Sequence, residues 1–174
     1  MEVLLAAITQ HWPSLVVEFF EDRLSRENAD ERDEDYEALP FNMHYLPERA
    51  APLRAPAIQT AKTLFDNDKK GFQYRGGKLV ALLAPEVSDI ESTLSAYLNT
   101  GQDADIEFVL DLLSAYSDGE SSTSTLCKEA IAALDPASDL LGDVKAVIEN
   151  SGVLSGEFGR VDFLKDKRGY VMGW

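Results

Sequence analysis

The second half of the chain repeats its pattern of apolar residues after about 35 positions. Five residues recur 36 positions later: Ile90, Leu94, Ala96, Tyr97 and Leu98 correspond to Leu126, Ala130, Ala132, Ala133 and Leu134. Four more recur 35 positions later: Ile106, Val109, Leu112 and Leu113 correspond to Leu141, Val144, Val147 and Ile148. Spacings of three and four residues within each set predict helices. Two helical pairs of equal length, each with an apolar face too small to fold alone, predict an all-α fold of the α-solenoid type.

Capping residues and prolines delimit four helices after Pro85. We predict these helices over residues 87–98, 103–116, 124–134 and 137–150. Polar residues suited to N-capping stand near the first three starts: Ser88 or Asp89, Asp103, and Ser122 or Thr123. Pro136 is expected in the first turn of the fourth helix, where its missing N–H costs no hydrogen bond. The short loops predict that neighbouring helices pack antiparallel.

Two further helices are expected at the N-terminal end. Residues 2–10 carry apolar side chains at helical spacing, namely Val3, Leu4, Ala7 and Ile8. Pro13 suits the first turn of a second helix that runs to about Arg26. The apolar face expected for this second helix consists of Leu15, Phe19, Phe20 and Leu24. Residues 1–26 therefore predict a first helical hairpin.

An irregular link is expected over residues 27–56. It opens with an acidic run, residues 27–37, which is either a solvated connector or a docking strip for a basic partner. Prolines then follow at short intervals, at Pro40, Pro47, Pro52 and Pro56, and they argue against a long helix across this stretch. A helix is expected again over residues 57–66.

The polar residues 66–71 should end that helix. We then favour a helix from about Gly77 to Leu83, with a short strand around Gln73 as the alternative. The intervening sequence Tyr74-Arg75-Gly76-Gly77-Lys78 lacks the spacing of a phosphate-binding loop, so we expect a turn followed by a helix start.

The whole chain, residues 1–174, is expected to be a single all-helical domain with helical repeats over residues 57–174. A ninth helix is expected from Gly156. The sequence ends on Met172-Gly173-Trp174, whereas a terminal repeat normally presents a polar outer face. This ending favours a fragment of a longer solenoid, or a last helix that docks on something else.

The formal net charge of −15 argues against nucleic acid as a ligand, because the backbone phosphates would be repelled. It leaves three roles for the charge: solubility, docking of a basic protein, or imitation of DNA. No apolar run approaches the roughly 18 residues of a membrane span. Glu2 stands where a secretory signal has lysine or arginine. We expect a cytoplasmic location and no membrane partner.

The sequence offers little catalytic chemistry. His11 and His44 are the only histidines, and no motif for a metal site accompanies them. The single Cys127 excludes an internal disulfide and is expected to be a small buried residue. The serine clusters at 121–125 and 151–155 are expected to cap helices. We therefore predict no enzyme activity, no cofactor and no metal.

The paired helices 90–98 with 106–113, and 126–134 with 141–148, resemble those of HEAT and armadillo repeat proteins. The resemblance implies a non-enzymatic scaffold or regulatory domain, part of a larger multidomain protein, that binds a protein partner or an adjacent domain. Such proteins present the second helix of each pair on a curved surface. Helical phase then places five residues on the partner-binding surface: Glu107, Asp111, Ser114, Lys145 and Glu149. The alternative is a small acidic inhibitor, an immunity-type protein or a DNA mimic, that captures a basic partner.

Overall fold

The computed structural model describes residues 2–27, 50–116 and 121–150, and every regular element in these ranges is helical. The all-α prediction is confirmed for this part of the chain. Two compact units emerge, Met1–Asp89 and Ile90–Trp174, and each is described by itself. Residues 28–49 of the expected link, the helix expected from Gly156 and the terminal Met172-Gly173-Trp174 lie outside the described residues.

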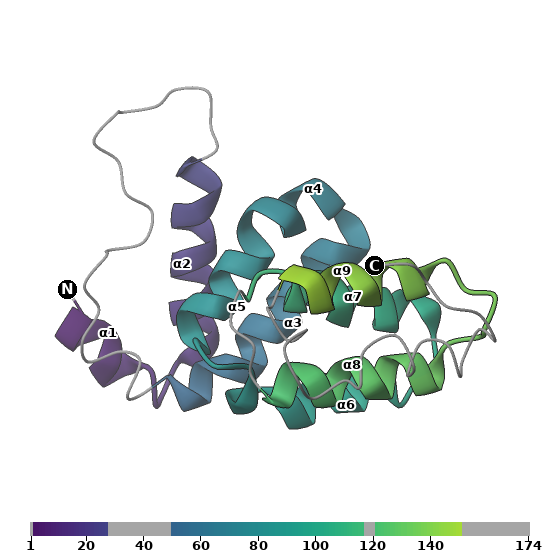
Figure 1. Ribbon diagram of the computed structural model, residues 1–174. Coiled ribbons are helices and arrows are strands. Elements are labelled where there is room, and N and C mark those ends of the chain that lie inside the picture. Colours follow the sequence, from purple (N-terminus) through teal and green to yellow (C-terminus); the bar gives the residue numbers. More distant parts are fainter. Residues whose placement is uncertain (1, 28–49, 117–120, 151–174) are drawn as a thin grey trace. The chain divides into compact units, whose positions relative to one another are not determined.

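In the first unit, α3 packs against α2, against α5 and against the π-helical turn that precedes α5 (Figure 1). The described elements are α1 (Glu2–Ile8), α2 (Pro13–Glu27), α3 (Ala51–Asn67), α4 (Lys69–Gly71), the π-helical turn (Phe72–Gly76), α5 (Gly77–Leu83) and a 3₁₀ turn (Val87–Asp89). The two N-terminal helices and the Pro13 start of α2 agree with the sequence prediction.

The buried face of α2 differs from the predicted one by a rotation of the helix. Val16, Val17, Phe20 and Leu24 are buried. Leu15 was expected among them but is 55% exposed, and Phe19 is half-buried. Both sets have helical spacing, so periodicity alone could not distinguish them.

Helix α3 starts earlier than predicted and crosses part of the expected irregular link. It begins at Ala51, and Pro52 lies in the first turn, where no N–H is needed. Pro56 lies inside the helix and removes one backbone hydrogen bond. The loss is offset because α3 buries a continuous apolar face, consisting of Leu53, Ala57, Ile58, Ala61 and Phe65.

The segment after α3 confirms one prediction and corrects another. The predicted break occurs at Asp68, whose carboxylate accepts a hydrogen bond from the Gly71 N–H at 3.0 Å. The predicted helix Gly77–Leu83 is α5. Between them, the turn or strand expected near Gln73 is instead a π-helical turn that continues directly into α5.

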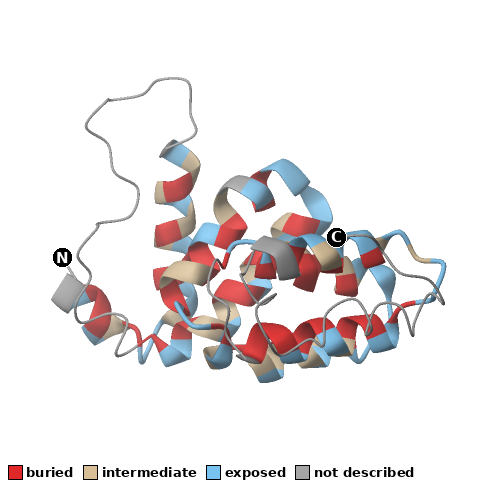
Figure 2. Cartoon of the chain, viewed as in Figure 1, coloured by how far each residue is buried: buried red, intermediate tan, exposed pale blue. Residues whose placement is uncertain are grey.

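The second unit contains the four helices expected after Pro85. These are α6 (Glu91–Leu98), α7 (Asp103–Leu113), α8 (Ser121–Ala133) and α9 (Leu140–Asn150). Helix α6 contacts α7 and α8, while α9 contacts α7 and α8 (Figure 1). Three positions of the first repeat are buried together with their counterparts 36 residues on: Ile90, Leu94 and Leu98, with Leu126, Ala130 and Leu134. Figure 2 shows buried stretches in red along the helices.

The expected capping residues do not cap these helices. Ser88 and Asp89 belong to the 3₁₀ turn before α6, and Asp103 is the first residue of α7 rather than its cap. Ser122 and Thr123 lie inside the first turn of α8. The N-cap residues are instead Ile90 for α6 and Gln102 for α7, and neither side chain makes a capping hydrogen bond.

Helix α9 begins at Leu140, so Pro136 does not occupy its first turn. The preceding residues form a turn held by side chains instead. The Asp135 carboxylate accepts a hydrogen bond from the Ala137 N–H at 2.7 Å, and the Ser138 hydroxyl accepts one from the Leu140 N–H at 3.3 Å. Such local bonds compete with the helix for backbone donors.

We expect two leucines on α2 to respond differently to truncation. Leu24→Ala should lower the free energy of unfolding by about 2–5 kcal/mol, because Leu24 is fully buried. Leu15→Ala, the same change on an exposed residue of the same helix, should cost less than about 1 kcal/mol. Urea unfolding of both variants measures the difference. Equal losses would contradict the observed orientation of α2.

Candidate functional site

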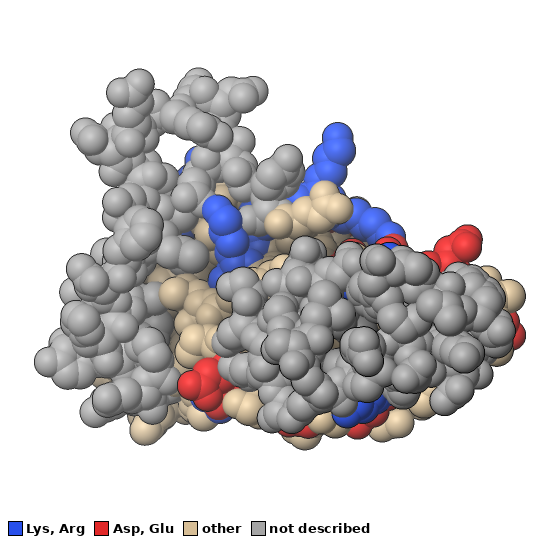
Figure 3. Space-filling model, viewed as in Figure 1, with Lys and Arg blue, Asp and Glu red and all other residues tan. Residues whose placement is uncertain are grey.

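Net charge is unevenly distributed between the two units, because most of the described basic residues lie in the first unit. The described part of the second unit carries ten acidic and two basic residues, a formal net charge of −8. The described part of the first unit carries nine acidic and eight basic residues, a net charge of −1. On the face shown in Figure 3, lysine and arginine atoms gather around α4. The second unit therefore carries most of the net negative charge of the described residues.

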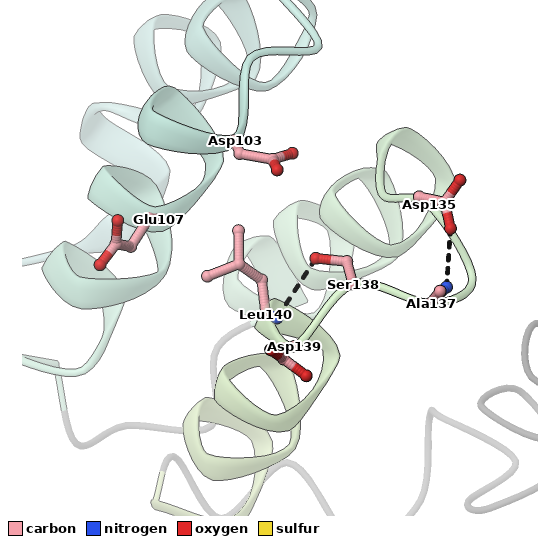
Figure 4. Close-up of a pocket in the computed structure, with 7 residues that line it drawn as sticks. All are labelled: Asp103, Glu107, Asp135, Ala137, Ser138, Asp139 and Leu140. Carbon is pink, nitrogen blue, oxygen red and sulfur yellow. Dashed lines mark hydrogen bonds between the residues drawn. The ribbon is translucent and has the colours of Figure 1, made fainter.

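An open hollow of about 540 Å³ lies in the second unit, between the start of α7 and the turn that leads from α8 into α9. Carboxylates make up four of its seven lining residues (Figure 4): Asp103, Glu107, Asp135, Ala137, Ser138, Asp139 and Leu140. Asp103 and Glu107 are one turn apart on α7, and the others come from the α8–α9 turn and the first residue of α9. The site therefore depends on packing between different repeats.

The carboxylates around this hollow do not converge on one point. Asp103 and Leu140 point into the space between α7 and α9, whereas Asp135 turns away toward the Ala137 N–H (Figure 4). Among the described residues, no group of three or more histidine, cysteine or acidic side chains could hold a metal ion. The hollow thus combines spread negative charge with an apolar side chain. Lysine and arginine side chains match this combination, because they carry a charge on an apolar stem.

A second hollow, of about 400 Å³, lies at the ends of α6 and α8 and is lined by Leu98, Asn99, Gly101, Glu129, Ala132 and Ala133. Its one carboxylate, Glu129, accepts a hydrogen bond from the Ser95 hydroxyl at 2.6 Å. Nearer the starts of the same two helices, the Ser122 hydroxyl donates a hydrogen bond to Glu91 at 2.7 Å. These acids hold α6 and α8 together, so this hollow offers less charge to a ligand.

Only one of the five predicted partner-binding residues lines the acidic hollow. This residue is Glu107, which is half-buried. Asp111 and Lys145 are half-buried elsewhere on α7 and α9, and the exposed Ser114 donates a hydrogen bond to the Asp111 carbonyl at 2.6 Å. Glu149 lies on α9, and only its backbone belongs to the described part of the structure.

Sequence reasoning assigned three acids of the hollow to other roles or to none. Asp103 was taken as a helix cap, and Asp135 and Asp139 were not considered as site residues. The signal for them was the polar sequence Asp135-Pro136-Ala137-Ser138-Asp139, which is typical of a turn. The start of α7, in the preceding repeat, is also acidic. These two acidic segments together could have indicated an acidic edge shared by the two repeats.

The cysteine and the histidines are the residues whose side chains could take part in chemistry, and their surroundings are as follows. Cys127 is fully buried on α8, and burial raises the pKa of its thiol from 9.0 to about 12. The predicted buried cysteine is therefore confirmed. His11 is exposed in the turn between α1 and α2, with its ring 5.7 Å from that of Trp12. His44 lies outside the described residues.

Comparison with known proteins gives no match to a family model, to a curated protein or to a solved structure. The resemblance to HEAT and armadillo repeats therefore stays a prediction. Within the described ranges, the helices are too short or too polar to cross a membrane.

The buried thiol should make stability depend on pH above neutrality. Because the pKa of Cys127 is raised by folding, its contribution is complete below pH 9 and is lost as the pH rises toward 12. At pH 10 the loss should reach about 1.4 kcal/mol relative to pH 7. Urea unfolding of the native chain and of Cys127→Ala at both pH values isolates this effect. An identical pH dependence in the two proteins would show that Cys127 is not the cause.

Proposed function

We propose that this chain is a non-enzymatic helical-repeat module whose second unit binds a basic segment of a partner protein. The observation that carries the proposal is the charge of −8 on the described part of that unit, together with its acidic hollow. The module would serve as a scaffold or regulatory domain within a larger protein. Its ligand chemistry is a lysine- or arginine-containing peptide segment.

The contacts between α6 and α8 support a stacked repeat. Glu91 and Ser95 of α6 meet Ser122 and Glu129 of α8, respectively, through two hydrogen bonds. The partners occur in the same order along both helices, as expected when the helices run side by side in the same direction. In a stack of helical hairpins, the first helices of successive hairpins have this relation. The matched burial of residues 36 positions apart supports the same arrangement.

Charge and shape together favour a basic protein segment as the ligand. Negative charge around the hollow attracts a cationic segment and repels nucleic acid. The exposed Asp103 and Asp139 flank the half-buried Leu140, so an ammonium or guanidinium group can approach the acids while its methylene stem contacts the leucine. The hollow is open, which suits a side chain presented by another protein.

The alternative function, a small acidic inhibitor that mimics DNA, uses the same charges. The two functions differ in which surface of the partner is bound, because a DNA mimic must occupy the DNA-binding site of its partner. Competition by duplex DNA for a captured partner would favour this alternative. A scaffold that binds a basic segment elsewhere on its partner would be insensitive to such competition.

Neutralising the hollow should weaken binding more than neutralising equivalent charges elsewhere. The probe is a fluorescent peptide of about ten residues in which lysine, arginine and leucine alternate. Asp103→Asn with Asp139→Asn should raise the Kd about 3- to 30-fold, the range for two partly solvated ion pairs. Glu18→Gln with Glu86→Gln is the matched control, because it changes the net charge equally at exposed residues of the first unit.

Fluorescence anisotropy at about 50 and 500 mM salt measures both variants, since screening at high salt should weaken the native interaction. Equal losses of affinity in the two double variants would show that only net charge matters. Binding that is insensitive to salt would also contradict the proposal.

A further inference from the structure

The first unit contains an uninterrupted helical segment, residues 69–83, with a π-helical turn in its middle. The Gly77 N–H donates to the Phe72 carbonyl, five residues back, instead of to the residue four back. A π turn contains one residue more than an α turn, is rare, and is frequently found at functional sites. Residues after it are therefore rotated by about one position, roughly 100°, relative to a continuous α-helix.

The sequence of α5 is compatible with either rotation. Residues 79–84 (Leu-Val-Ala-Leu-Leu-Ala) are all apolar. With the π turn, Leu79, Val80 and Leu83 are buried, whereas Leu82 is half-buried. In a continuous α-helix, Leu79 and Leu83 would lie in line with Phe72. Leu82 would then turn toward α3, and Val80 would move to the edge of the contact between α5 and α3. Burial of apolar area therefore distinguishes little between the two registers.

Polar contacts of Arg75 do distinguish them. From within the π turn, the Arg75 guanidinium donates to Glu21 of α2 at 2.9 Å and to Asp68 at 3.1 Å. The Arg75 side chain is 19% exposed and that of Glu21 is 27% exposed, so solvent weakens this pair less than a surface pair. Asp68 also accepts from the Gly71 N–H, which fixes the start of the segment. Rotation of residues in the turn would break this set of contacts.

Two glycines leave room for the π turn. A Cβ atom on Gly76 would lie 2.6 Å from Cδ2 of Phe72, whose ring packs edge-on against Phe65. A Cβ atom on Gly71 would collide with the Asp68 carboxylate and the Arg75 guanidinium. In an α-helix, side chains four residues apart are ordinary neighbours, so alanine at position 76 would be acceptable beside Phe72.

We propose that residues 69–83 form a two-register helix, and that the ion pairs of Arg75 with Glu21 and Asp68 select the register with the π turn. Loss of these pairs converts the turn to α-helix and rotates α5 against α3. Val80 and Leu82 then exchange places at the contact with α3. This conformational device lies entirely in the first unit, so it is independent of the proposed binding function.

Single cysteines at positions 80 and 82 report the register. In a Cys127→Ala background, Leu82→Cys should react with a thiol reagent faster than Val80→Cys, because Leu82 is half-buried and Val80 is buried. Adding Arg75→Met should reverse this order, with each rate changing about tenfold as the major conformation changes. Gly76→Ala should reverse it by an independent route. Arg75→Lys keeps the charge and should retain more of the native order.

Two results would overturn the proposal. An unchanged order of reactivity in both Arg75→Met and Gly76→Ala would show that the register does not depend on these residues. Faster reaction at both positions together would show that the changes loosen the first unit without rotating α5. Circular dichroism of each variant, recorded before labelling, identifies the second case by a loss of helix signal.

Discussion

The apolar seam shared by α6, α7, α8 and α9 is the constraint on which the second unit depends. Leu94 and Leu98 of α6 are buried together with Ile90, the residue before this helix. Leu126 of α8 is buried together with Leu134, the residue after that helix. Helices of 8 to 13 residues are too short to be stable alone in water. Their stability must therefore come from this shared burial. Once the apolar positions face inward, the acids between them are directed toward the surface.

Polar contacts set the register that apolar contacts leave open. In the second unit, Ser95 with Glu129 and Ser122 with Glu91 fix how far α8 lies along α6. In the first unit, Arg75 joins Glu21 to the π turn. Apolar contacts are not directional, so they tolerate sliding and rotation, whereas a hydrogen bond or ion pair has a defined geometry. Both units thus combine apolar burial with a few specific polar ties.

Local patterns predicted the helices well where composition changed sharply at their ends. Pro13 marked the start of α2, and the polar residues near Asp68 marked the end of α3. The pattern failed where tertiary packing overrode it. Pro56 is tolerated because α3 has a continuous buried face, and Leu15 was assigned to the wrong side because two faces of α2 have equal spacing. No local signal could reveal the π turn, because its tie to Glu21 spans 54 residues.

The acidic hollow was only partly predictable for the same reason. Glu107 was assigned to a binding surface from its helical phase, but its neighbours in the hollow come from the α8–α9 turn. Their proximity depends on contact between α7 and α9, which a single sequence does not specify. Side-chain bonds of Asp135 and Ser138 also moved the start of α9 away from Pro136. A site between repeats thus requires the packing as well as the pattern.

The most direct test of the central claim is to map where a basic ligand binds. Amide chemical shifts of the ¹⁵N-labelled protein, recorded during titration with a lysine- and arginine-containing peptide, locate the contact residue by residue. If the second unit is the binding module, shifts should concentrate at Asp103, Glu107 and residues 137–140. Shifts confined to the first unit, or spread evenly over all exposed acids, would contradict it.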